Sequence, residues 1–168
     1  MILFHQFVPC MKIAKELIKF YTREFDLFDA FSACSVTVFG CLFPTREHAY
    51  HFYKFSDYPQ IQDQIARAGS PYEAKAIAHA NRDRIRKDWK KLKLPVMEKI
   101  MRAQLTQHSI MQEKLFETGD RLLIEDSSTD DFWGRGPNGD GQNHMGKIWM
   151  ELRNELKSKI AKDEELQF

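Results

Sequence analysis

The amino-acid sequence predicts a mainly helical α+β domain with a small sheet of short strands. Segments with a helical spacing of apolar residues outnumber the strand-like runs, which are only a few residues long. The chain has 168 residues, of which 43% are hydrophobic and 29% charged, as expected of one globular domain with a sizeable core. We expect this compact domain to occupy residues 18–160, after an N-terminal extension of unknown role at 1–17 and before a tail at 161–168 that frays.

Two short strands come first in the predicted order of elements. They cover residues 18–21 and 34–40, and in the second one valines alternate with other side chains as in a half-buried strand. Gly40 indicates a turn at the end of this strand. Thr45 is a suitable N-cap, so a helix is expected to begin immediately after it.

The clearest helix start in the chain lies at Ser70. Glu73 follows three residues later, which is the spacing of a capping box, and Pro71 occupies the first helical position. The later elements expected are a helix at 94–108, a helix from Ser109 that ends before Gly119, a strand at 121–126, a long loop at 127–143 and a final helix from about Asn143.

Composition and charge exclude several classes of protein. The formal net charge is +1, so no strong overall field favours nucleic acid or a membrane surface, although a local basic patch remains compatible with this value. No stretch approaches the roughly 18 apolar residues of a membrane span, and residues 1–10 lack the features of a signal peptide. Cys10, Cys34 and Cys41 show no CxxC spacing and are expected to be reduced thiols. These features predict a cytoplasmic protein without membrane association.

The expected helix after Thr45 carries charged and aromatic residues together. Glu47, Tyr50, His51 and Lys54 fall on one stripe because residues three and four apart share a helix face. One interpretation is a solvated Glu/Lys stripe. The other is a carboxylate half-buried among aromatic rings, whose pKa is tuned for acid–base or charge-stabilising work. His48 and His51 lack the spacing of a zinc-binding HExxH motif, so no metal site is expected.

The glycine-rich run at 134–139 matches the pattern GxGxxG but lacks its structural context. It lies in a polar loop and no βαβ unit surrounds it, so a dinucleotide site is not expected. Its glycines would let the backbone approach a ligand closely, and Asp130, Asp131 and Trp133 directly precede them. The alternative interpretation is an ordinary solvated turn.

A basic segment at 81–91 surrounds one tryptophan, Trp89. Guanidinium groups such as those of Arg82, Arg84 and Arg86 bind phosphate, and an aromatic ring stacks on a planar base. The segment therefore suits a phosphorylated planar ligand or a nucleic-acid backbone. A basic helix surface with Trp89 anchored in the core remains equally open.

These segments together resemble the YbiA-like or NADAR family. The resemblance is carried by "FDAFSACSVTVFGCLFPTREHAYHFYKF" at 28–55, "NRDRIRKDW" at 81–89, "DDFWGRG" at 130–136 and "GQNHMGKIWMELRNEL" at 141–156. It implies a compact, mainly helical α+β domain and an N-glycosidase that hydrolyses a bond between ribose C1 and nitrogen, with no cofactor. Members that resemble this chain act on phosphorylated ribosylaminouracil intermediates of riboflavin synthesis, and others remove ADP-ribose from guanine in nucleic acid.

The resemblance, together with the residue patterns described above, gives the expected site residues. The catalytic positions it implies are Glu47, Asp130, Trp89 and Trp133. The substrate-binding positions expected are Lys54, Tyr50, Arg82, Arg86, Asn143, Asp131, Gly134 and Phe31. One departure concerns the segment "FDAF" at 28–31, where the family usually has "FSNF": Ala30 replaces an asparagine able to bind a ligand, and Asp29 stands beside it.

A mechanism follows from the chemistry of the reaction. Positive charge develops on the ribose ring as the bond breaks, so Glu47 is expected to stabilise this charge or to activate water. Asp130 would orient hydroxyls or share acid–base work, and Trp89 and Trp133 would exclude water. Lys54 and some of the arginines would hold phosphate.

The expected partner is a phosphorylated ribosyl small molecule or an ADP-ribosyl group. Nucleic acid carrying that modification is an alternative substrate, although the near-neutral charge favours the metabolite. A non-catalytic module that binds NAD or ADP-ribose is a second alternative, supported by the departure in "FDAF". A nucleic-acid-binding protein without chemistry would show a steep salt dependence of binding.

Overall fold

The computed structural model describes residues 16–20 and 23–165. The helices of this part of the chain are α1 (Arg46–Tyr53), α2 (Pro59–Ala66), α3 (Pro71–Ala80), α4 (Trp89–Gln107), α5 (Ser109–Glu117) and α6 (His144–Glu165). Its strands are β1 (Leu17–Lys19), β2 (Val36–Val38), β3 (Cys41–Phe43) and β4 (Leu122–Ile124). The mainly helical α+β architecture predicted from the sequence is therefore confirmed. Most of the predicted N-terminal extension lies outside the described residues.

The strands form two separate pairs and not the single small sheet that the sequence predicted. β1 pairs with β4 in parallel, and Ile18 lies opposite Leu123. β2 pairs with β3 in an antiparallel hairpin, in which Val38 lies opposite Cys41. Phe39 and Gly40 form the two-residue turn with φ angles of 57° and 77°, which is the positive-φ geometry that suits a tight hairpin.

The predicted caps at two helix starts are confirmed. The Thr45 hydroxyl accepts a hydrogen bond from the backbone N–H of His48 at 3.3 Å, and the Ser70 hydroxyl accepts one from Glu73 at 3.1 Å. The Glu73 carboxylate accepts in turn from the backbone N–H of Gly69 at 2.7 Å. Both helix starts thus satisfy N–H groups that a helix otherwise leaves free.

Three helical elements differ from the prediction. α4 begins at Trp89, five residues ahead of the predicted start at residue 94. The prediction places Pro95 in the first turn of the helix, but this proline lies inside it. α6 continues to Glu165, past residue 160 where fraying was expected. α2 was not predicted; its eight residues bury only Ile61 and Ile65 and have no side-chain cap.

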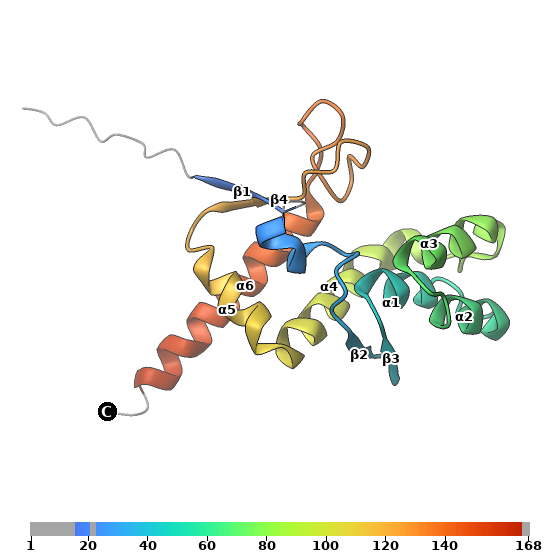
Figure 1. Cartoon of the computed structure of the whole chain (residues 1–168), viewed down its shortest axis with the longest axis horizontal. Helices are drawn as coiled ribbons and strands as arrows, with labels where there is room; N and C mark the ends of the chain where they lie inside the picture. The colour runs from blue at the N-terminus through green and yellow to red at the C-terminus, as the bar shows by residue number, and fades with distance from the viewer. Residues whose placement is uncertain (1–15, 21–22, 166–168) are drawn as a thin grey trace, which may run out of the picture.

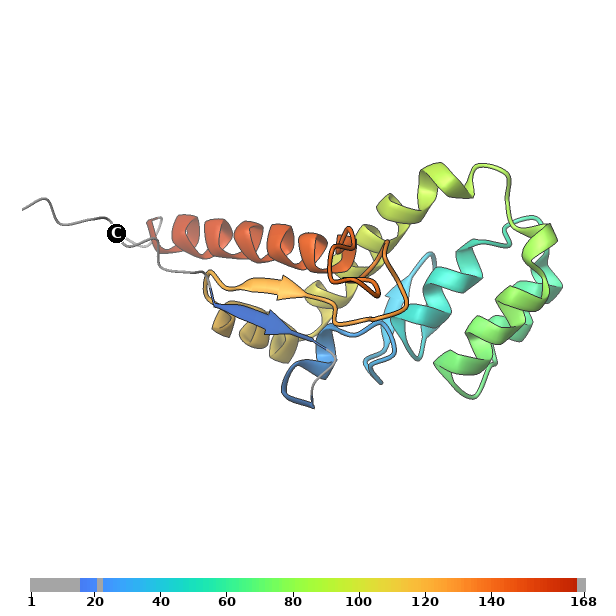
Figure 2. The same ribbon diagram turned by 90° about the horizontal axis from the view of Figure 1, so that it is seen from above.

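The elements gather into two regions joined by α4. Figure 1 shows α1, α2 and α3 together at one end of the molecule and α5 and α6 toward the other, with α4 running between them. Seen from above, the β1–β4 pair lies alongside α6, and the long loop that follows β4 returns beside the start of α6 (Figure 2). No helix of the described residues is long and apolar enough to cross a membrane.

A buried arginine ties these regions together. Arg46, at the start of α1, is fully buried, and its guanidinium donates to Gln104 of α4 at 2.9 Å and to the carbonyl of Phe28 at 3.0 Å. The indole of Trp149 in α6 donates to the same carbonyl at 3.0 Å and stacks against the guanidinium. Segment 28–31 is therefore held at a fixed place between α1, α4 and α6.

Candidate active site

A cavity of about 520 Å³ opens where these segments meet. Its walls come from segment 29–31, from α1 and α3, and from the end of β4 with the loop that follows it. Among the predicted site residues, those that line it are Phe31, Glu47, Tyr50, Lys54, Asp130 and Trp133. The structure thus brings half of the twelve predicted site residues into one cavity, from three distant parts of the chain.

Two side chains of α1 and that of Lys54, which directly follows the helix, form a hydrogen-bonded ladder along one side of this cavity. The carboxylate of Glu47 lies 2.8 Å from His51 Nε2, and His51 Nδ1 lies 2.9 Å from Lys54 Nζ. An ammonium group can only donate, so Lys54 donates to Nδ1 and the proton of the neutral imidazole is on Nε2. His51 then donates to Glu47, and the ladder presents a fixed carboxylate to the cavity.

Charge states follow from this ladder. Burial opposes the charged form of Glu47, but the hydrogen bond from His51 and the positive charges of Lys75 and Lys54 outweigh it, so the pKa of Glu47 lies below its ordinary value. Burial lowers the pKa of His51, which keeps the imidazole neutral at neutral pH. Burial also lowers the pKa of Lys54 to about 8, against the opposing attraction of Glu47. Glu47 is therefore a buried, ionised carboxylate.

Aromatic rings back this ladder and wall the cavity. Tyr50 meets the ring of Trp89 at a centroid distance of 4.9 Å and that of Trp133 at 5.7 Å, both edge to face. Trp133 lines the cavity, whereas Trp89 does not and instead supports Tyr50 from behind. Lys54 Nζ lies over the Tyr50 and Trp89 rings at 4.6 Å and 5.4 Å. Burial raises the pKa of Tyr50 above its ordinary value, so it remains a neutral phenol.

Asp130 shapes the loop after β4 as well as lining the cavity. Its Oδ1 accepts the backbone N–H groups of Phe132 at 2.9 Å and Trp133 at 2.7 Å. This oxygen therefore fixes the turn that carries Trp133, and the carboxylate has its second oxygen left for a ligand. Asp131 is exposed and lies outside the cavity lining, which separates the two adjacent aspartates that the sequence could not tell apart.

The remaining predicted positions support the site from outside the lining. Asn143 has a φ of 51° and uses its side chain to accept from the backbone N–H of Glu125 at 3.0 Å and to donate to the carbonyl of Leu123 at 2.9 Å. Gly134 packs so closely that a Cβ there would meet the Glu125 carbonyl oxygen at 2.8 Å. Both residues hold the end of β4 in place.

The two predicted phosphate-binding arginines also lie away from this cavity. Arg82 is exposed, and Arg86 forms a two-point ion pair with Asp88 and lines a separate hollow of about 490 Å³. The backbone N–H of Arg86 donates to the carbonyl of Lys54 at 2.9 Å, so this segment supports the end of α1.

Several cavity residues were missed in the sequence. Lys75 and His79 stand one turn apart on α3, Tyr72 lies one turn before them, and all three line the cavity. Their spacing was visible, but only the burial of Ala74 and Ala78 on the neighbouring face shows which way α3 turns. Lys75 gives the cavity lining a positive charge that the sequence did not predict.

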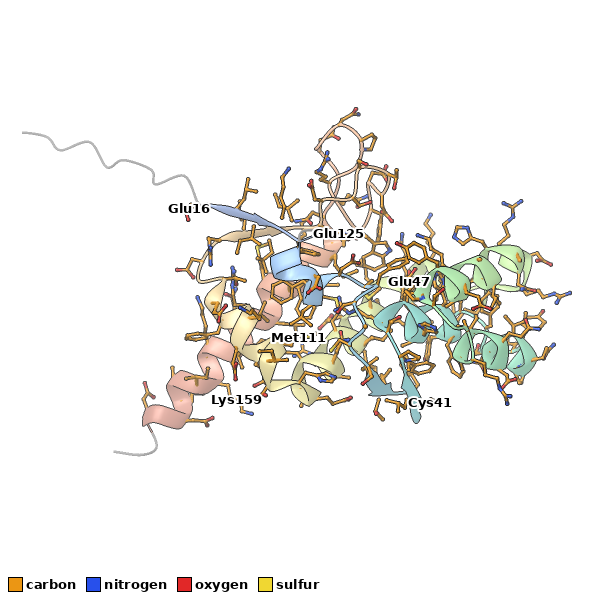
Figure 3. The ribbon with its side chains drawn as sticks, in the orientation of Figure 1. Glu16, Cys41, Glu47, Met111, Glu125 and Lys159 are labelled. Carbon is orange, nitrogen blue, oxygen red and sulfur yellow. The ribbon has the colours of Figure 1, made fainter. Side chains whose placement is uncertain are left out.

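Two further carboxyl groups line the cavity. Asp29 accepts from the backbone N–H of Phe31 at 3.1 Å, and burial raises its pKa above the ordinary value. Glu125, labelled in Figure 3, directly follows β4. It is 8% exposed. The departure in "FDAF" was the only sequence signal for Asp29, and a glutamate at a strand end gave none for Glu125. No group of three or more His, Cys, Asp or Glu residues in the described ranges is arranged to hold a metal ion.

Comparison with known proteins agrees with this geometry. A profile of the NADAR domain family matches residues 10–157. The chain belongs to the NADAR domain family. The N-glycosidase YbiA of Escherichia coli (strain K12) is 34% identical to it over 142 residues, which are 83% of this chain and 88% of that protein. The NMR structure of E. coli YbiA has a TM-score of 0.80 at 32% identity and covers 88% of each chain.

A further relative of this chain has a different name. The riboflavin biosynthesis protein VVA0006 of Vibrio vulnificus is 36% identical over 126 residues, which are 75% of this chain but only 34% of that longer protein. Membership of the NADAR family thus confirms the resemblance seen in the sequence, and the solved structure confirms the fold. An N-glycosidase, as these relatives are named, is a hydrolase that acts on N-glycosyl bonds.

Proposed function

We propose that the protein is an N-glycosidase that hydrolyses the bond between ribose C1 and nitrogen in a phosphorylated ribosyl compound. The observation that carries this proposal is the ionised Glu47 carboxylate, buried at 7% exposure beside a cavity large enough for a small ribosyl ligand. An oxocarbenium-like ribose needs a negative charge close to C1, and a buried carboxylate provides it most strongly.

Each wall of the cavity has a place in this chemistry. Lys75 and His79 suit the phosphate, because both are exposed basic side chains that line the cavity. Trp133 and Phe31 suit the flat faces of the base. Asp130, with one oxygen committed to its own loop, suits a ribose hydroxyl. Glu47 either stabilises the charge on the ribose or takes a proton from the attacking water.

The name of the Vibrio relative favours ribosylaminouracil phosphates as the substrate class. The experiment is incubation of the purified protein with a phosphorylated ribosylaminouracil, with release of the free base followed by chromatography. A parallel incubation uses an oligonucleotide that carries ADP-ribosylated guanine. Release of the base from the metabolite supports the proposal. Release of ADP-ribose alone would select the nucleic-acid alternative, and tight binding of ADP-ribose without any turnover would select the non-catalytic module.

A further inference from the structure

Glu125 has a carboxyl group that the protein itself leaves unsatisfied. The side chain is 8% exposed and lines the cavity, and its Oε2 is buried without a hydrogen-bond partner among the described residues. Leaving a buried polar atom unpaired costs roughly 1–3 kcal/mol in proteins. Such a group in a ligand cavity is typical of an atom whose partner arrives with the ligand.

The backbone of Glu125 is fixed from two sides, so the point from which its side chain reaches the cavity is fixed. Its N–H donates to the Asn143 side chain at 3.0 Å, and its carbonyl accepts from the backbone N–H of Arg135 at 3.0 Å. Gly134 packs against the same carbonyl. The residue thus stands at the junction of β4, the long loop and the start of α6 (Figure 3).

The surroundings of Glu125 favour its neutral, protonated form. Burial is the largest cause, and the carboxylates of Asp29, Asp130 and Glu47 act in the same direction. Only Arg46 opposes them among the causes that shift this group, and the resulting pKa of Glu125 is about 8. Glu47 is shifted the other way by His51, Lys75 and Lys54. One cavity therefore holds two glutamates, one ionised and one protonated, which is the pattern of an acid and a base in glycoside hydrolysis.

We propose that Glu125 is the general acid of the reaction and donates its proton to the nitrogen that leaves ribose C1. This inference rests on the proposed N-glycosidase function. As the C1–N bond breaks, its electron pair remains on nitrogen, which takes the proton from Glu125. Water forms the new bond to C1 and gives a proton to Glu47. Glu47 then releases that proton and Glu125 regains one from solvent, so the cycle consumes only water.

Asp130 is less suited to this step than Glu125. Its Oδ1 already accepts two backbone hydrogen bonds and is committed to the turn that carries Trp133. Glu125 has no such donors on its buried oxygen.

The first experiment compares two leaving groups in Glu125→Gln. The base of a ribosylaminouracil phosphate leaves ribose C1 as an amine and needs a proton. The base of a phosphorylated N-ribosylpyridinium leaves as a neutral pyridine and needs none. We expect kcat to fall at least about 100-fold on the first substrate and less than about 10-fold on the second. Glu47→Gln, as the matched variant, loses turnover on both. Equal losses on the two substrates in Glu125→Gln, or no loss on either, would overturn the assignment.

The second experiment needs no substrate and separates the two proposals. Infrared difference spectra across pH 5–9, with Glu125→Gln as the reference, follow the carboxylic-acid carbonyl band of this residue. A band that persists at pH 7 supports a protonated Glu125. A band that has vanished by pH 6 overturns the general-acid assignment even if the protein cleaves N-ribosyl compounds. If the band persists but no N-ribosyl compound is cleaved, the proposed function is wrong while the charge state of Glu125 stands.

Discussion

The charge state of Glu125 makes a prediction about stability that is independent of any substrate. Its pKa is raised from the ordinary 4.5 to about 8. Between these values the folded protein holds a proton on Glu125 that the unfolded chain has released. The free energy of unfolding therefore contains a contribution that is fully present below pH 4.5 and is lost as pH rises through 8. Glu125→Gln lacks this contribution because an amide does not titrate.

The magnitude follows from the two pKa values. Each unit of pKa difference is worth about 1.36 kcal/mol, so the contribution falls by roughly 4 kcal/mol between pH 5 and pH 9. For a chain of this size that corresponds to a change of about 10 °C in Tm. The quantity to measure is the difference in unfolding free energy between wild type and Glu125→Gln, obtained from urea titrations at pH 5, 7 and 9.

The control for this experiment is Glu151→Gln, the same substitution at an exposed position of α6. Its stability should run parallel to that of wild type across the range. Taking the difference between variants cancels the titration of Asp29 and Lys54, which all three proteins share. A difference in unfolding free energy between wild type and Glu125→Gln that changes by less than about 1 kcal/mol between pH 5 and pH 9 would refute the reasoning. Glu125 would then be ionised in the folded state.

Three further substitutions test the rest of the site. Glu47→Gln should lower kcat at least about 100-fold yet change Tm by only a few degrees, because the amide still accepts from His51; full turnover in this folded variant would remove Glu47 from the mechanism. Arg46→Ala should lower the unfolding free energy measured by urea titration by about 3–5 kcal/mol, because two carbonyls and Gln104 lose a buried cation. Its control is Arg102→Ala, which removes exposed ion pairs and should cost less than about 1 kcal/mol. Lys75→Met should raise KM about 10-fold for a phosphorylated substrate and change KM much less for the unphosphorylated riboside, with Lys159→Met on α6 as the control; an unchanged KM would place the phosphate elsewhere.

The helix starts could be predicted because caps act locally. The elements that were missed have apolar patterns too short to recognise in the sequence. Thr45 and Ser70 act within four residues of themselves, so their caps are visible in the sequence. β3 has three residues, and α2 depends on two buried isoleucines, so neither offers a long enough pattern. Pro95 misled the prediction because proline usually opens a helix and seldom lies inside one.

The same division explains which site residues the sequence could indicate. Glu47, Tyr50, His51 and Lys54 share one helix face, so their spacing already placed them together. Whether that face meets water or a cavity depends on packing, and the sequence left both interpretations open. Glu125 reaches the site only because β4 pairs with β1 and the loop after it is held by Asn143. Such tertiary placement leaves no periodic signal at the residue itself.

Charge counting explains why two glutamates in one cavity differ in protonation. Arg46 is fully buried and acts on Asp29, Glu125 and Glu47 at once, and its own pKa is lowered by burial to about 10, so it stays charged at neutral pH. One guanidinium cannot balance three carboxylates in a medium of low dielectric. Glu47 has the additional support of His51, Lys54 and Lys75, all of which lower its pKa. Glu125 has none of these three, and apart from Arg46 the charges that act on it are negative, so the proton that the cluster must carry resides there. A ribose bound in this cavity would meet Glu47 as the base and Glu125 as the acid, while Lys75 of the same lining would bind the phosphate.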